Sequence, residues 1–146
     1  DDCKKYDEIV FCGYGEPTLR LDTIKEVSKK IKEAGGKVRL NTNGHGNVIN
    51  KRNILPELKG LIDSVSISLN ADTEEAYDQI VRPLPGLRNG IYNKVKEFIE
   101  EAKKYIPEVQ ATIVTHQEGV DEEKCEEMSK NDFDVKYRPR RYNIVG

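Results

Sequence analysis

Short apolar runs alternate along the chain with longer segments in which apolar residues recur at helical spacing. A run rich in β-branched and aromatic residues that stops at a glycine, as 8–12 does before Gly13, is typical of a buried strand. Apolar residues every three or four positions predict a helix instead. The pattern therefore predicts five strands, at 8–12, 37–42, 64–69, 110–115 and 133–138. It predicts helices at 21–34, 54–60, 73–80, 90–105 and 121–130.

The helical segments also indicate which side faces the core and where each helix ends. In 21–34 the apolar face consists of Ile24, Val27, Ile31 and Ala34. In 90–105 it consists of Ile91, Val95, Phe98, Ile99 and Ala102. Asp22 is the expected N-cap of the first helix, and Gly35 and Gly36 are its expected end. Asp72 and Thr73 are expected to open 73–80.

Repeated strand–helix units predict an α/β fold with a parallel sheet and right-handed crossovers. Ligands of such sheets bind beyond the carboxyl ends of the strands. The residues that follow the predicted strands are therefore the ones to inspect for chemistry.

Composition narrows the class of protein. The chain has 146 residues, with 24 lysines and arginines against 26 aspartates and glutamates, a net charge of −2. This balance argues against a dedicated nucleic-acid binder, which normally carries a basic excess. No apolar run approaches the ~20 residues of a membrane span. Three scattered cysteines, Cys3, Cys12 and Cys125, form no disulfide framework and no zinc or CxxC spacing; with no secretory leader, the chain is expected in the cytoplasm.

The first strand leads into Gly13-Tyr14-Gly15-Glu16-Pro17-Thr18. Two glycines and a proline can hold the backbone so that carbonyls and the Glu16 carboxylate meet an ammonium group. A plain tight turn between strand and helix is the equally weighted alternative. The spacing does not match the dinucleotide-binding GxGxxG or a P-loop.

The second strand leads into Asn41-Thr42-Asn43-Gly44-His45-Gly46. Asn41 and Asn43 could bind sugar hydroxyls or a carboxylate, and an ordinary Asn-Gly turn is the alternative. His45, placed between two glycines, is expected to be an exposed loop residue. His116 is the only other histidine, so a multi-histidine metal site is not expected, and no metal ligand is assigned.

Alternation in the third strand puts Ser64, Ser66 and Ser68 on one face. They suit either the polar inside of an open barrel, where Ser68 and Asn70 meet a ligand, or a solvent face. The last strand ends in the basic stretch 138–141, which could bind phosphate or carboxylate or form a basic surface tail. The glutamates at 122, 123, 126 and 127 are expected to form a solvated helix face.

The segment 9–19, IVFCGYGEPTL, resembles the GGEP segment of the radical S-adenosylmethionine (radical SAM) superfamily. The NTNG of 41–44 and the SISLNA of 66–71 follow in that family's order, and the nearest similarity is to the TatD-associated radical SAM proteins. The resemblance spans nearly the whole chain. It implies a partial (β/α)6 TIM-like barrel formed as one domain by 1–146, with helices on the outside of about five parallel strands.

The resemblance also implies cofactor contacts. Family GGEP groups hold the amino group of S-adenosylmethionine, which corresponds here to Tyr14, Gly15, Glu16 and Pro17. The polar residue at the end of the next strand corresponds to Asn41 or Asn43. Groups near the ribose or carboxylate correspond to Ser68 and Asn70, and the last-strand contact to Tyr137 or Arg138.

One departure from the family concerns the cysteines. The family holds a 4Fe-4S cluster on a CxxxCxxC loop, and reduction of bound S-adenosylmethionine gives a 5′-deoxyadenosyl radical. Cys3, Cys12 and Cys125 do not form this loop, and Cys12 is expected to be buried in a strand. The expectation is therefore a radical SAM core fragment without its first βα unit, inactive alone and without a bound cluster.

Two other readings stay open. The chain could be a non-redox α/β module that binds a nucleotide or amino acid, or a scaffold that has lost the site. The substrate and reaction are not readable from these segments. If a neighbouring strand is absent, the edge of 8–12 is exposed, and self-association through that edge is expected.

Overall fold

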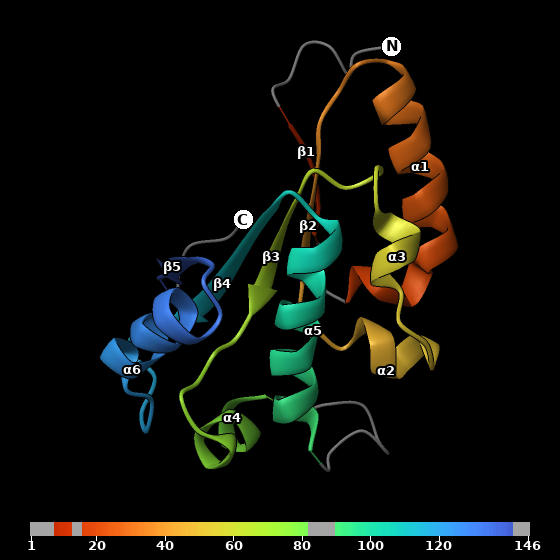
Figure 1. Ribbon diagram of the computed structural model, residues 1–146. Coiled ribbons are helices and arrows are strands. Elements are labelled where there is room, and N and C mark those ends of the chain that lie inside the picture. The colour runs from red at the N-terminus through yellow and green to blue at the C-terminus, as the bar shows by residue number, and fades with distance from the viewer. Residues whose placement is uncertain (1–7, 13–15, 82–89, 142–146) are drawn as a thin grey trace.

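The computed structural model describes residues 8–12, 16–81 and 90–141. Five parallel strands form one sheet in chain order (Figure 1). The strands are β1 (Ile9–Phe11), β2 (Val38–Thr42), β3 (Ser64–Ser68), β4 (Glu108–Val114) and β5 (Lys136–Arg140). The predicted α/β class and parallel sheet are confirmed.

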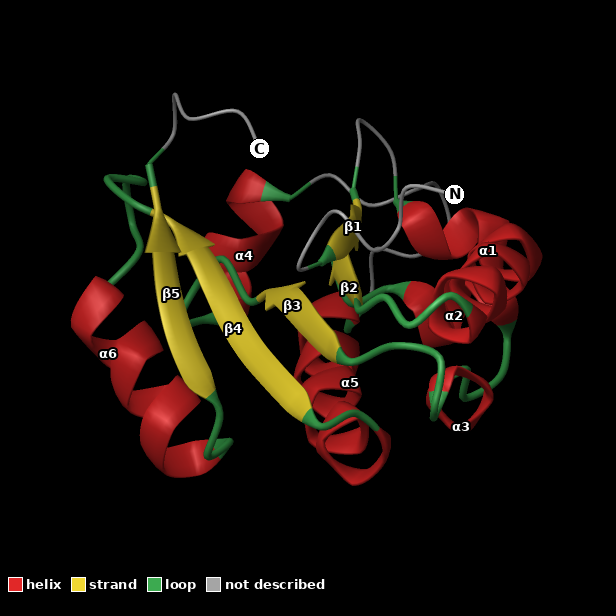
Figure 2. Ribbon diagram, turned by 90° about the horizontal axis from the view of Figure 1, so that it is seen from above, coloured by secondary structure: helices red, strands yellow, loops and turns green. Residues whose placement is uncertain are grey.

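Most of the helices follow one another around the outside of the curled sheet (Figure 2), whereas the helix after β3 lies beyond the carboxyl end of that strand (Figure 1). They are α1 (Leu21–Glu33), α2 (Gly46–Asn50), α3 (Leu55–Leu58), α4 (Glu74–Ile80), α5 (Ile91–Tyr105) and α6 (Glu122–Glu127). A 3-10 turn (Pro17–Arg20) precedes α1, and a π-helical turn (Met128–Asp132) follows α6. Helices on the outside of a curled parallel sheet are the arrangement of a partial TIM-like barrel.

The core lies between the helices and the outer face of the sheet. The apolar face of α5 is buried as its spacing predicted, and it packs against β3 and β4. The outer residues of the central strands, Val65, Ile67, Ala111 and Ile113, are at most 1% exposed. Because these residues face the helices, the residues that alternate with them along each strand point inward.

The inner face of the sheet is polar. Ser64 and Ser66 lie on it and are 4% and 7% exposed, because longer polar neighbours cover them. The Arg39 Nε donates to the Ser64 hydroxyl at 3.2 Å, and the Gln110 amide donates to the Ser66 hydroxyl at 2.6 Å. The serines therefore line the inside of an open barrel, and the solvent-face alternative is wrong for these two.

The start of the first helix differs from the prediction. Asp22 lies within the first turn of α1 and is not its cap, because the 3-10 turn already begins at Pro17 with Glu16 as its N-cap. Ser28 is buried on α1, whereas Val27 is 37% exposed. The predicted end is confirmed: Gly35 has a φ of +84°. Elsewhere, Thr73 caps α4 as predicted by accepting from the Ala76 amide.

The last strand begins three residues later than predicted. Phe133 is buried at the end of the π-helical turn, and Asp134 takes a left-handed φ of +55° before β5 starts at Lys136. Pro139 lies in this strand, which is at the edge of the sheet. The segment 133–138 shows the alternation of a strand because its second half, from Lys136, belongs to β5.

Strand β1 forms the other edge of the sheet, where it has three residues and pairs with β2. Val10 is 40% exposed. Cys12 follows the strand and is exposed, so its predicted burial is wrong. Among the described residues, β1 has no second neighbouring strand to cover its open edge. In the part of the chain that the structure describes, no helix has the length and apolarity needed to cross a bilayer.

We expect the chain to self-associate through β1, because an uncovered edge offers unpaired backbone groups and the apolar Val10 side chain. The apparent mass in light scattering should rise with concentration. Val10→Lys should suppress the rise, since an edge lysine opposes strand addition. Val27→Lys is the matched control, because Val27 is a comparably exposed valine on α1. A constant monomer mass at high concentration would rule this out.

Candidate functional site

The Glu16 carboxylate joins the ends of β1 and β2. Oε1 accepts from the Asn43 amide at 2.8 Å, and Oε2 accepts from the Thr18 amide at 3.2 Å. The hydroxyls of Thr18 and Thr42 also donate to Oε2. Both carboxylate oxygens are therefore bound within the protein. The carboxylate therefore shapes the turn. The turn can offer a ligand its backbone groups and the remaining lone pairs of the carboxylate.

The neighbours of Glu16 complete this turn. Pro17 begins the 3-10 turn, where its fixed φ suits the first position and its missing N–H costs nothing. Tyr14 and Gly15 lie outside the described residues. A contact of this segment with a ligand amine stays a prediction.

The side chains of Asn41 and Asn43 differ in whether the protein itself uses them. The Asn43 Oδ1 accepts from the His45 amide at 2.9 Å, so this side chain is used in the turn. Asn41 lies on the inner face, opposite Ser66 in the strand register. Its Oδ1 is buried and has no hydrogen-bond partner among the described residues. Because buried amide oxygens are nearly always bonded, Asn41 is the better candidate for a ligand contact.

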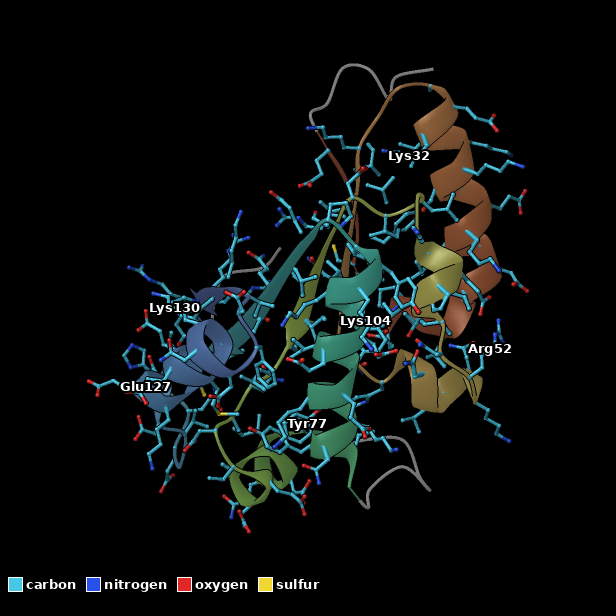
Figure 3. All side chains as sticks on the ribbon, in the orientation of Figure 1. Lys32, Arg52, Tyr77, Lys104, Glu127 and Lys130 are labelled. Atoms are coloured by element: carbon cyan, nitrogen blue, oxygen red, sulfur yellow. The ribbon has the colours of Figure 1, made fainter. Side chains whose placement is uncertain are left out.

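His45 is buried, with 3% of its surface exposed, so the predicted exposed loop histidine is wrong. Its Nε2 lies 2.8 Å from the Tyr77 hydroxyl, and the two share a hydrogen bond. Tyr77 lies between α4 and α5 (Figure 3), where its ring centroid is 5.1 Å from that of Tyr92. Burial lowers the pKa of His45 from 6.5 to about 4 and raises the pKa of Tyr77. Both side chains are therefore neutral near pH 7.

The two glycines that flank His45 lie where the backbone passes close to neighbouring side chains. A Cβ at Gly44 would lie 3.1 Å from Ile67 and Val95 side-chain atoms. A Cβ at Gly46, the first residue of α2, would lie 2.6 Å from the Ile54 Cδ1. The glycines thus mark a crowded turn that leads into a helix, and the sequence pattern alone did not indicate α2.

The carboxyl ends of β3, β4 and β5 bring a further polar row together. Ser68 is opposite Thr112, and Thr112 is opposite Arg138. Asn70 has a φ of +65°, and its amide donates to the Thr112 carbonyl at 3.2 Å, so it forms the bend after β3. Gln110, one register position earlier on this face, was missed because its strand showed no distinctive pattern.

The two last-strand candidates point to opposite faces. The Tyr137 hydroxyl donates to the Glu122 carbonyl on α6 at 3.4 Å, so Tyr137 faces the helices. Arg138, its neighbour in an extended strand, faces the inner side. The inner-face contact can therefore come from Arg138 and not from Tyr137.

The two described cysteines do not by themselves fit a 4Fe-4S cluster. Cys125 is buried on α6, and burial raises the pKa of its thiol to about 12, which disfavours the thiolate that binds iron. Cys12 is exposed after β1, and Cys3 lies outside the described residues. Within 8–12, 16–81 and 90–141, no three His, Cys, Asp or Glu side chains are grouped to hold a metal ion.

Comparison with known proteins gives a family and two relatives. The model of the radical SAM superfamily matches residues 1–130. A Methanocaldococcus jannaschii protein named "Putative glycyl-radical enzyme activating enzyme" is 34% identical over 125 residues, 85% of this chain and 49% of the relative. An uncharacterized protein of the same organism is 34% identical over 101 residues, 68% of this chain and 32% of the relative. The chain thus spans half or less of these curated relatives. No solved structure gives a significant match.

We predict that His45 makes stability depend on pH. Its folded pKa of about 4 lies below the unfolded 6.5, so only the unfolded chain binds a proton between these values. The free energy of unfolding should keep its full value above pH 6.5 and fall as the pH is lowered towards 4. The loss that this group causes should be on the order of 3 kcal/mol. Urea unfolding across this range should show a shallower dependence for His45→Gln.

His116→Gln is the control, because it removes the same side chain from an exposed position. In the unaltered chain, the His45 imidazole signals in NMR should not titrate above pH 5. An imidazole that titrates near 6.5, or a slope that His45→Gln leaves unchanged, would contradict the buried neutral pair.

Proposed function

The chain belongs to the radical SAM superfamily, and we propose that the inner face of its sheet binds S-adenosylmethionine. The observation that carries the proposal is the buried Oδ1 of Asn41, which has no hydrogen-bond partner in the described part of the chain. A buried acceptor without a donor costs about 1–3 kcal/mol. A ligand hydroxyl or amino group at this point would remove that cost, and both groups are present in S-adenosylmethionine.

The surrounding residues suit the same ligand. Asn41 is beside Ser66 in the register, and the half-buried Ser68 lies one step nearer the carboxyl ends of the strands. We assign the ligand's amino group to the backbone of the turn at 14–17. Asn41, Ser68 and Asn70 are assigned to its ribose or amino-acid part, and Asn43 acts by shaping the turn. When bound, S-adenosylmethionine supplies a sulfonium whose carbon–sulfur bond breaks on one-electron reduction.

The proposal for this chain stops at binding, because its cysteines do not fit a cluster. We propose that the thiolates that would hold a 4Fe-4S cluster lie outside these 146 residues, so that radical formation belongs to a larger protein. Anaerobic reconstitution of the chain with iron and sulfide should then load no cluster and give no cleavage of S-adenosylmethionine. Uptake of about four irons per chain, the content of such a cluster, together with cleavage would contradict this.

Two finer assignments remain proposals. The GYGEPTLR, NTNG and SISLNA series supports a TatD-associated radical SAM protein. The relative named as an activating enzyme of glycyl-radical enzymes supports a second candidate, in which a whole protein of this kind acts on another protein. A reducing, cytoplasmic setting is part of either proposal, since the described thiols of Cys12 and Cys125 are both free.

We expect the chain to bind S-adenosylhomocysteine, the unreactive analogue, in isothermal titration calorimetry. Asn41→Ala should weaken binding by about tenfold, since it removes a buried acceptor that the ligand bonds. Asn93→Ala is the matched control, because Asn93 is exposed on α5, outside the sheet. No binding to the unaltered chain, or equal losses in the two variants, would count against the proposal.

A further inference from the structure

Strand β5 carries three cations on one face. Lys136, Arg138 and Arg140 alternate with Tyr137 and Pro139 along the strand. Because Tyr137 bonds to α6 on the helix side, the three cations point to the inner face, where the polar residues of β2, β3 and β4 also lie. This clustering is local, since the chain as a whole has a net charge of −2.

The inner-face cations differ in whether a carboxylate neutralises them. Near the amino ends of the strands, Arg39 lies 3.2 Å from Glu8, and Lys136 lies 3.5 Å from Glu108. Towards the carboxyl ends, neither Arg138 nor Arg140 has a carboxylate of the described residues within 4.0 Å. Arg140 is half-buried and Arg138 is exposed, so both can reach an anion in solution, and a guanidinium suits bidentate binding of a carboxylate or phosphate.

Hydroxyl donors lie next to these two arginines. Thr112 is opposite Arg138 and is 3% exposed, and its hydroxyl makes only a long contact of 3.5 Å with the Ile67 carbonyl. Ser68 follows in the same row. The Thr115 amide donates to the Arg140 carbonyl at 2.8 Å, which continues the pairing of β4 with β5 past Val114. Guanidinium groups beside hydroxyls, without a carboxylate, make a receptor for an anion.

We propose that Arg138 and Arg140, with the hydroxyls of Thr112 and Ser68, bind a carboxylate or phosphate group at the carboxyl end of β5. The site rests on the proposed function in one respect, since it shares the inner face with Asn41. Three strand intervals, roughly 14 Å, separate β2 from β5, so one extended ligand or two adjacent ligands can reach both points. The anion is either the carboxylate of S-adenosylmethionine or a group on a second molecule that reacts beside it.

The test uses the full chain, two variants and three probes in calorimetry. S-adenosylhomocysteine carries the carboxylate, 5′-methylthioadenosine has the same nucleoside thioether without it, and inorganic pyrophosphate carries only anionic charge. Arg138→Gln and Arg140→Gln should each weaken binding of an anionic probe by at least about tenfold. Lys136→Gln is the matched control, because it removes the same charge from the same face at a position already paired with Glu108.

The outcomes separate the two sources. Loss of S-adenosylhomocysteine affinity without loss of methylthioadenosine affinity supports the carboxylate of the nucleoside ligand. Loss of pyrophosphate affinity alone supports an anionic group on a second molecule. Arginine variants that leave both anionic probes unchanged, or a Lys136→Gln variant that loses as much affinity, would overturn the site. If the unaltered chain binds no S-adenosylhomocysteine, the proposed function fails, while the pyrophosphate comparison still decides the anion site.

Discussion

The carboxylate of Glu16 holds the ends of two neighbouring strands together, and the candidate site depends on it. By accepting from the amides of Thr18 and Asn43, it starts the 3-10 turn that leads into α1 and also sets the turn that leaves β2. Asn43 in turn binds the His45 amide and so determines where the buried imidazole lies. One charged group, half-buried and bonded on both oxygens, thereby positions segments that are 27 residues apart in the chain.

The His45–Tyr77 pair extends this arrangement to the helices. Tyr77 packs against Tyr92 on α5, and the Tyr92 hydroxyl donates to the Ala71 carbonyl at 2.8 Å in the loop after β3. The loops that follow β2 and β3 are thus connected through neutral aromatic groups. Neutrality is what allows them to be buried, because a protonated imidazole at this position would lose its hydration.

The sequence predicted the elements whose patterns directly reflect burial. Helix α5 and strand β3 have periods of 3.6 and 2, and both lie where those periods placed them. The errors arose where a local pattern has a tertiary cause. Gly44 and Gly46 suggested an exposed loop around His45, although Gly44 has a φ of +83° close to Ile67 and Val95, and a side chain at Gly46 would crowd Ile54.

The candidate site shows the same division. Its location at the carboxyl ends of the strands follows from the parallel order alone. The difference between Asn41 and Asn43 does not, because it depends on which side chain the turn itself uses. Likewise, Tyr137 and Arg138 are adjacent in the sequence, and only the bond from Tyr137 to α6 shows which of them faces inward.

The two edge strands of the sheet differ in how readily a further strand could pair with them. Strand β5 contains Pro139, which has no N–H to donate, and alternate cations that would repel a second basic strand. Strand β1 is short, apolar and free of proline and charge over its three residues. Of the two edges formed by the described strands, β1 is therefore the one that could accept a further strand, whereas β5 opposes one. The edge open to pairing is also the one where Glu16 joins the first two strands.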